Sequence, residues 1–330
     1  MVFLRSEINF NPPENSIKMS LRNYKITYQI FNFFNKKKLK HNIPLFKKYG
    51  IKKKYYSPLS SEDFRQLEAK PNIHDQVDSA INLPKNDAFL ALEERFKTPL
   101  LSWSKNGYAI LENFFSEEEV AACNTEIDTL LQEGKVKFKY NNKIMFAFHK
   151  SSLINNMGTN EKMNSVLKTI LGKKASLFQS INFLTGSQQN THSDSIHMTT
   201  FPYGNLIAVW VALEDISIDS GPLHYYPGSH KLPYVMNREY DNLGSKHKLG
   251  PKTYKDYEKH IAGIIEETKL KKEVFLAKKG DILIWHANLL HGGEQLIDSN
   301  STRKSMVLHY YCEDAICYHE ITQRPSLKQT

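Results

Sequence analysis

Two histidines, one aspartate and one arginine have the types and spacing to perform chemistry. His192 and Asp194 form a His-x-Asp pair, and His291 and Arg303 follow much later in the chain. Two imidazoles and one carboxylate on one face of a metal leave three adjacent coordination positions open, which is the facial triad of non-haem Fe(II) oxygenases. The pair suits such a site if it lies in a strand, because side chains at i and i+2 of a strand share a face.

Two histidines compete for the distal ligand position. His286 ends the apolar run ILIW, whereas His291 precedes Gly292 and Gly293, where the backbone can approach a site closely. This difference favours His291. On a strand that continues past the His-x-Asp pair, His197 faces away from the ligands, so we expect it either to support the ligands indirectly or to have a structural role.

Arg303 also has two interpretations. It could pair on the surface with Asp298, or it could point inward, since it opens the strand-like run 305–311. An inward guanidinium needs an anion, and its planar fork matches a carboxylate through two hydrogen bonds. Thr302 and Ser305 are polar neighbours that could line the same pocket.

The motifs around these residues form an ordered set: NGYAILENFFSEEEV at 106–120, QNTHSDSIHM at 189–198, NLIAVWVALED at 205–215, PGSH at 227–230, KGDILIWHANLLHGG at 279–293 and TRKSMVLHYY at 302–311. Together they resemble the phytanoyl-CoA dioxygenase family of Fe(II)/2-oxoglutarate oxygenases over roughly residues 100–320. The resemblance implies that His192, Asp194 and His291 bind Fe(II). It also implies that Arg303 anchors the distal carboxylate of 2-oxoglutarate.

The resemblance extends to two further residues. Trp210 shares one face of its strand with Ala208 and Ala212, and family likeness makes it an inner wall beside the co-substrate. His230 of the PGSH motif is implied to lie near the site. The implied reaction consumes O2 and 2-oxoglutarate, releases succinate and CO2, and hydroxylates a C–H bond of a small-molecule or acyl-type substrate.

The expected fold is mainly β with flanking helices, around a double-stranded β-helix core of the jelly-roll, cupin-like type. We expect a basic, partly helical arm at 1–60, a helical and loop extension at 61–100, and the oxygenase domain at 101–330. A polar insertion at about 237–272 should lie near the mouth of the site. Local signals predict a strand at 108–111 and helices after Ser116 and around 254–267.

Charge is concentrated in the N-terminal arm. Residues 1–60 contain 13 Lys and Arg but only Glu7 and Glu14 as acids, a net of +11, whereas the whole chain is +9 and residues 61–330 therefore carry −2. The arm could contact an anionic membrane surface or an acidic partner, or pack as a helix with a solvated lysine face. No motif that reads nucleic acid accompanies the charge, so we expect no nucleic-acid partner.

Other features bound the class of protein. Three cysteines in 330 residues are too few for a disulfide framework, and neither a signal peptide nor an apolar run of ~20 residues is evident. We therefore expect a cytoplasmic enzyme. Two alternatives remain: a related iron oxygenase performing desaturation, cyclisation or halogenation, or a non-catalytic jelly-roll binding module. Asp194 argues against halogenation, because the halogenases of this architecture usually carry a small residue there.

Overall fold

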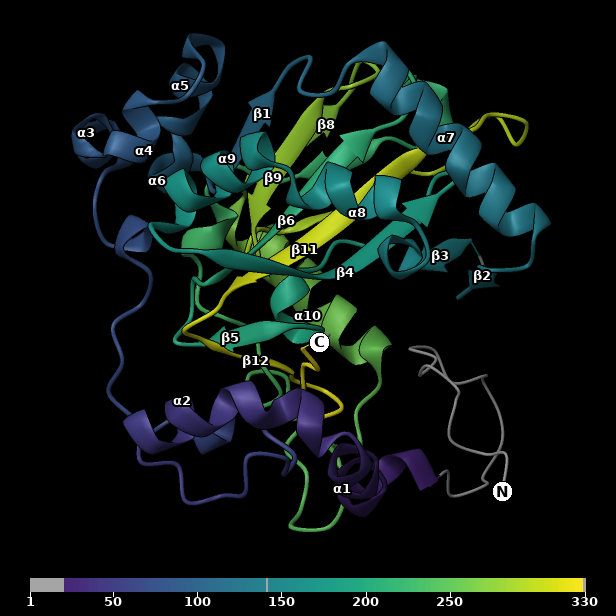
Figure 1. Cartoon of the computed structure of the whole chain (residues 1–330). Helices are drawn as coiled ribbons and strands as arrows, with labels where there is room; N and C mark the ends of the chain where they lie inside the picture. The colour runs from purple at the N-terminus through teal and green to yellow at the C-terminus, as the bar shows by residue number, and fades with distance from the viewer. Residues whose placement is uncertain (1–20, 141, 329–330) are drawn as a thin grey trace.

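The computed structural model describes residues 21–140 and 142–328 and is built around antiparallel sheets (Figure 1). The described strands are β1 (Tyr108–Leu111), β2 (Phe138–Lys139), β3 (Lys143–Met145), β4 (Ala175–Phe183), β5 (Thr199–Phe201), β6 (Leu206–Ala212), β7 (Leu223–Tyr225), β8 (Glu273–Phe275), β9 (Ile282–His286), β10 (His291–Gly293), β11 (Ser305–Cys312), β12 (Ile316–His319) and β13 (Arg324–Pro325).

A seven-stranded sheet in the order β1-β9-β6-β11-β4-β3-β2 faces a three-stranded sheet in the order β10-β7-β8. Side chains of both sheets meet in one buried cluster, in which Trp210 of β6 packs with Leu223 of β7 and Phe275 of β8. This double-sheet arrangement confirms the predicted jelly-roll core. A third small sheet, β13-β12-β5, extends the core toward the N-terminal helices.

Strand β6 lies at the centre because both of its faces are apolar. Ile207, Val209 and Val211 point to the helix-covered side of the large sheet, and Ala208 and Trp210 point to the interior between the sheets. The predicted alternation along this strand is thus confirmed. It directs Trp210 toward the functional residues.

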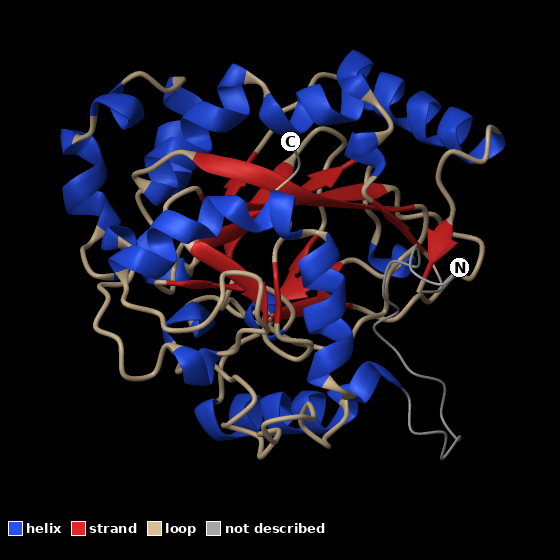
Figure 2. Ribbon diagram, turned by 60° about the horizontal axis from the view of Figure 1, so that its bottom comes forward, coloured by secondary structure: helices blue, strands red, loops and turns tan. Residues whose placement is uncertain are grey.

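Helices flank the sheets (Figure 2). The described α-helices are α1 (Lys25–Phe34), α2 (Ile43–Lys48), α3 (Ser79–Asn82), α4 (Asp87–Leu90), α5 (Glu94–Leu100), α6 (Trp103–Asn106), α7 (Glu117–Gln132), α8 (Ser152–Thr159), α9 (Glu161–Leu171) and α10 (Tyr254–Thr268). Helices hold 38% of the residues and strands 19%, so helical residues outnumber those of the sheets.

Helices α7, α8 and α9 cover the outer face of the large sheet and share its principal hydrophobic cluster. Helix α7 begins as predicted, because Ser116 and Glu119 form a reciprocal capping box that satisfies two backbone amides. The helix ends before Gly134, which adopts a left-handed φ of 67°. The predicted strand at 108–111 is β1, which pairs with β9.

The N-terminal helices pack beneath the small sheet. Phe46 of α2 and Phe64 join Phe201 of β5 and Tyr318 of β12 in a separate cluster, and the rings of Phe64 and Phe201 stack at 4.5 Å. In the 237–272 segment, helix α10 covers the predicted helical stretch. Residues 1–20 of the basic arm lie outside the described residues.

Candidate metal and co-substrate site

Three side chains converge in the interior between the two sheets. One potential ligand atom from each of His192, Asp194 and His291 lies within 4.8 Å of the others, and all three residues are buried. The backbones of the two histidines form an antiparallel bridge with reciprocal N–H···O bonds of 2.9 Å. The bridge brings together two segments that are distant in sequence.

The prediction that the His-x-Asp pair lies in a strand is wrong. His192 takes part only in the isolated bridge, and Asp194 begins a 3₁₀ turn, η7 (Asp194–Ile196). Ser193 between them is extended, with φ −105° and ψ 150°, so the two side chains still emerge on the same side. The amide of His197 then donates to the carbonyl of Asp194 at 2.8 Å, which closes the turn.

Each of the two imidazoles is oriented by the backbone carbonyl of the residue two positions earlier in the chain. Nδ1 of His192 lies 2.9 Å from the carbonyl of Asn190, and Nδ1 of His291 lies 2.9 Å from that of Leu289. A carbonyl can only accept, so Nδ1 carries the proton in each ring. Nε2 of both rings is then left with its lone pair directed into the site, as metal ligation requires.

The two oxygens of the Asp194 carboxylate have different partners. Trp285 binds Oδ2, and Oδ1 is the oxygen nearest His291. Oδ2 accepts a 2.8 Å hydrogen bond from Nε1–H of Trp285 and lies 3.6 Å from Nε2 of His309, while Oδ1 lies 3.8 Å from Nε2 of His291. Burial alone would raise the pKa of Asp194, but His291, His309 and His192 together hold it below its ordinary value. Asp194 is therefore ionised.

The histidines have the complementary protonation state. Burial lowers the pKa of His192 well below its ordinary value, and the neighbouring His291 lowers it further. Burial also lowers the pKa of His291, although Asp194 opposes this shift. Two neutral imidazoles and an ionised carboxylate are the forms that bind a divalent cation without releasing protons.

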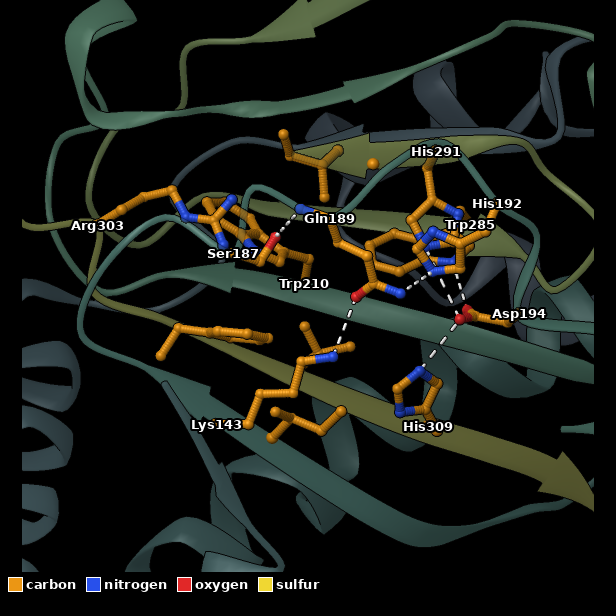
Figure 3. Close-up of a pocket in the computed structure, with 15 residues that line it drawn as sticks. Lys143, Ser187, Gln189, His192, Asp194, Trp210, Trp285, His291, Arg303 and His309 are labelled. Carbon is orange, nitrogen blue, oxygen red and sulfur yellow. Dashed lines mark hydrogen bonds and ion pairs between the residues drawn. The ribbon is translucent and has the colours of Figure 1, made fainter. Parts of the chain in front are cut away.

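The three residues form one end of a pocket whose empty volume, open mouth included, is about 470 Å³. Figure 3 shows Arg303 at the other end and Lys143 and Gln189 between the two. The walls are largely apolar and aromatic, and the pocket is lined by Lys143, Ile181, Phe183, Ser187, Gln189, His192, Asp194, Trp210, Leu223, Trp285, His291, Gly292, Arg303, Val307 and His309.

Arg303 is a buried cation with an incomplete set of partners. Its side chain is 2% exposed, one guanidinium nitrogen donates to the carbonyl of Gly221 at 3.3 Å, and Nε has no partner. No carboxylate among residues 21–140 and 142–328 lies within 4.0 Å of the guanidinium; Asp298 instead binds the amide of Asn300 and the hydroxyl of Ser301. Burial lowers the pKa of Arg303 to about 10. The guanidinium remains charged at neutral pH and needs an anion.

The pocket also contains a lysine that the sequence did not reveal. Nζ of Lys143 donates to Oε1 of Gln189 at 3.0 Å, and the amide nitrogen of Gln189 lies 3.2 Å from Nε2 of His192. Burial lowers the pKa of Lys143 to about 8, and Asp194 partly opposes the shift. Lys143 is on the short strand β3, far from the recognised motifs, so no local signal identifies it.

His309 and Trp285 were missed for different reasons. His309 lies on β11, and alternation from Arg303 would have placed it on the same side of the strand. Trp285 lies inside the apolar run that ends at His286, where an aromatic residue reads as core. Its contact with Asp194 depends on the pairing of distant segments.

Three residues expected at the co-substrate do not line the pocket. Thr302 is exposed and donates to Glu214 at 2.9 Å, and Ser305 is buried with its hydroxyl 3.4 Å from the carbonyl of Arg303. His230 lies beside His286, with ring centroids 5.5 Å apart. Of the residues expected at the co-substrate, Trp210 and Arg303 are on the pocket wall. Thr302 precedes β11 and its hydroxyl binds Glu214 instead of entering the pocket.

His286 is excluded as the distal ligand by its position. It ends β9 and its Nε2 lies 3.4 Å from a carboxylate oxygen of Asp75, away from the three converging residues. The backbone of His286 also pairs with Ile207 of β6. The structure therefore brings His291, and not His286, to His192 and Asp194.

A family model for phytanoyl-CoA dioxygenase (PhyH) matches residues 103–305. The chain belongs to this family. Ectoine dioxygenase of Stutzerimonas stutzeri is 24% identical over 289 residues, which are 78% of this chain and 89% of that protein. A Caenorhabditis elegans phytanoyl-CoA dioxygenase domain-containing protein 1 homolog is 25% identical over 182 residues, 52% of this chain and 62% of its own length.

Solved structures of iron- and 2-oxoglutarate-dependent enzymes share the fold. The carbocyclase SnoK from nogalamycin biosynthesis superposes with a TM-score of 0.55 at 15% identity and covers 69% of this chain and 87% of SnoK. EctD from S. alaskensis with 2-oxoglutarate and 5-hydroxyectoine superposes with a TM-score of 0.51 at 19% identity and covers 68% and 81%. These likenesses show the jelly-roll fold.

Family membership and the converging His192, Asp194 and His291 define the class of enzyme. The chain is an Fe(II)- and 2-oxoglutarate-dependent dioxygenase, with O2 as the other co-substrate. None of the described helices combines the length and apolar character that a membrane span requires.

Proposed function

We propose that His192, Asp194 and His291 hold Fe(II), that Arg303 binds the distal carboxylate of 2-oxoglutarate, and that the enzyme hydroxylates an unactivated C–H bond of a small-molecule or acyl-type substrate. Succinate and CO2 are the co-products. The observation that carries this proposal is the buried, incompletely paired guanidinium of Arg303 at the end of the pocket opposite the three ligands.

The buried guanidinium of Arg303 favours the binding of an anion. A buried charge without a counter-ion is costly, and the cost is recovered when an anion with matching hydrogen-bond acceptors enters. A carboxylate meets the guanidinium fork with two parallel hydrogen bonds. A linear dicarboxylic 2-oxo acid therefore fits a pocket with a cation at one end and a metal-binding set at the other.

The other lining residues determine what the pocket admits. Phe183 and Trp210 form apolar walls beside Arg303, whose guanidinium carbon lies 5.5 Å from the Phe183 ring centroid, and they exclude water from the charged group. The ammonium of Lys143 offers an acidic group in the pocket a second cation besides Arg303. Iron and 2-oxoglutarate, when bound, would activate O2 for the oxidation, and the protein would supply ligand orientation, charge and a dry cavity.

Hydroxylation is supported by the ectoine dioxygenase relative, which spans most of this chain. Cyclisation is the second candidate, because a carbocyclase shares the fold, and desaturation belongs to the same group of outcomes. Asp194 stands where a halide would need to bind, which disfavours halogenation. A non-catalytic binding module is disfavoured by the complete, buried ligand set.

The proposal is tested by succinate release and by 2-oxoglutarate binding. Anaerobic titration with Fe(II) and 2-oxoglutarate should produce the visible absorption of the iron chelate in wild type but not in His291→Ala. Candidate metabolites are then screened for stimulation of succinate release, and the product is identified by mass spectrometry. Absence of both chelate absorption and succinate release would refute the proposal.

Two properties of the protein outside the pocket are also proposals. All three cysteines are buried and free, which supports a reducing, cytoplasmic location. We also propose that the basic arm contacts an anionic membrane or an acidic partner. This contact would not depend on the reaction in the pocket.

A further inference from the structure

Helix α1 turns an apolar face to solvent. Ile26, Ile30, Phe33 and Phe34 follow the i, i+4, i+7, i+8 spacing of one helix face, and their exposed fractions are 56%, 45%, 45% and 73%. The opposite face, which includes Tyr28, is buried against the protein. Helix α1 therefore exposes apolar side chains that a surface helix usually buries. We name Ile26, Ile30, Phe33 and Phe34 the α1 face.

Helices α1 and α2 form one edge of the molecule, at the bottom of Figure 1, remote from α3, α4 and α5. Asn35 alone separates Phe34 from the 3₁₀ helix η2 (Lys36–Asn42), whose Lys36, Lys37 and Lys40 are exposed. The α1 face is thus an outer surface that continues into a cationic segment.

Aromatic rings and lysines interleave at this edge. Nζ of Lys36 lies 4.5 Å from the ring centroid of Phe33, whose ring meets that of Tyr56 edge to face at 5.8 Å. Nζ of Lys54 lies 5.9 Å from the Tyr56 centroid, so the contacts form a continuous series. Residues 21–60 contain 11 Lys and Arg and no acidic residue.

We propose that the α1 face docks on an anionic membrane surface. An amphipathic helix that combines aromatic and aliphatic residues with flanking lysines lies in the bilayer interface, with its apolar residues below the headgroups. The lysines add electrostatic attraction to anionic lipids, and their long side chains reach the headgroups while their methylenes stay beside the apolar residues.

Charge complementarity selects this occupant over others. A second copy of the chain seated on the same face would bring two sets of 11 cations together, which opposes a symmetric dimer. A nucleic acid would use the lysines but leave the isoleucines and phenylalanines of the α1 face in water. An anionic bilayer satisfies both features, because it offers negative headgroups above an apolar layer.

The test is co-sedimentation of the full-length chain with phosphatidylcholine vesicles that contain or lack phosphatidylserine. Binding is expected only to the anionic vesicles and should weaken at high salt. The double substitution Ile26→Ser with Phe34→Ser should lower the partition coefficient about tenfold or more. Reversal of Lys36 and Lys37 to Glu should lower it by about fivefold or more per residue.

Matched controls separate this role from general surface effects. Ile81→Ser removes a 63% exposed isoleucine on α3. Lys174→Glu reverses the charge of a side chain that is 80% exposed. Neither substitution should change vesicle binding. All variants should keep wild-type thermal unfolding and 2-oxoglutarate binding, which makes this test independent of the proposed function.

Three outcomes would overturn the proposal. Failure of the full-length chain to bind anionic vesicles at low salt would exclude a membrane partner. Binding of polyglutamate by such a chain, measured by titration calorimetry, would point to an acidic protein instead. Equal binding by the α1-face double variant and wild type would exclude the face itself. Concentration-dependent dimerisation that is lost with Phe34→Ser, measured by sedimentation velocity, would assign the face to self-association.

Discussion

The indole Nε1–H of Trp285 donates a 2.8 Å hydrogen bond to Oδ2 of Asp194. This bond occupies Oδ2, whereas Oδ1 is the oxygen nearest the imidazole of His291, at 3.8 Å from its Nε2. A carboxylate held in this way presents a single oxygen to a metal. Trp285 is thus a positioning residue, since it acts through Asp194.

Trp285→Phe removes this donor and keeps an aromatic ring in the core. We expect Fe(II) affinity to fall by about tenfold or more, as is typical when a partner of a metal ligand is lost. Anaerobic Fe(II) titration of the metal-free protein measures the change. Trp103→Phe, which alters a buried tryptophan outside the pocket, is the control and should leave the affinity unchanged. Equal affinities of Trp285→Phe and wild type would show that the indole does not position Asp194.

Arg303→Met tests the co-substrate anchor. Loss of a buried, charged hydrogen-bond pair costs about 2–5 kcal/mol, so the KM for 2-oxoglutarate should rise at least about tenfold while Fe(II) affinity stays nearly constant. The ligand-free variant should unfold at the same or a higher temperature than wild type, because the incompletely paired buried charge is gone. Thr302→Val is the neighbouring control, and an unchanged KM in Arg303→Met would exclude Arg303 as the anchor.

Lys143 should make stability depend on pH in the metal-free protein. Burial lowers its pKa to about 8 from an ordinary 10.5, so between these values the unfolded state binds more protons than the folded state. The contribution of Lys143 to the free energy of unfolding therefore rises as pH increases through this window.

Urea unfolding at a series of pH values measures this contribution. The stability of wild type relative to Lys143→Met should increase by at least about 1 kcal/mol across the window. Lys137→Met changes an exposed lysine near the same strand and should show no such trend. A wild-type profile that parallels that of Lys143→Met would contradict the prediction.

The choice of distal ligand is tested by a pair of alanine variants. His291→Ala should abolish tight Fe(II) binding and turnover, because it removes one of three ligands. His286→Ala should retain Fe(II) affinity, since His286 contacts Asp75 and not the ligand set. Isothermal titration with Fe(II) measures both, and the reverse result would assign the distal position to His286.

Several features of the fold could be predicted because their determinants are local. The capping box at Ser116 and the alternation along β6 depend on residues a few positions apart, and both are present in the structure. The ligand candidates were also predictable, since the His-x-Asp pair and the later His291 and Arg303 occur in a motif order that indicates the family. Their roles stay predictions until the variants are measured.

The expectation for the His-x-Asp pair shows where local pattern fails. Alternation correctly placed His192 and Asp194 on one side, but the chain turns immediately after Ser193 instead of continuing as a strand. The only strand-like pairing there is the bridge to His291, and a single bridge leaves no periodic trace in the sequence.

By itself, the sequence determined the family, the candidate ligands, strand β1, helices α7 and α10 and the concentration of charge before residue 61, because each is encoded by residue types at short, regular spacing. Only the tertiary structure decided that Trp285 and His309 contact Asp194, that Lys143 enters the pocket and that Thr302 leaves it. It also decided that the apolar face of α1 points to solvent. These relationships join segments distant along the chain, and their geometry depends on how the sheets and helices pack against one another.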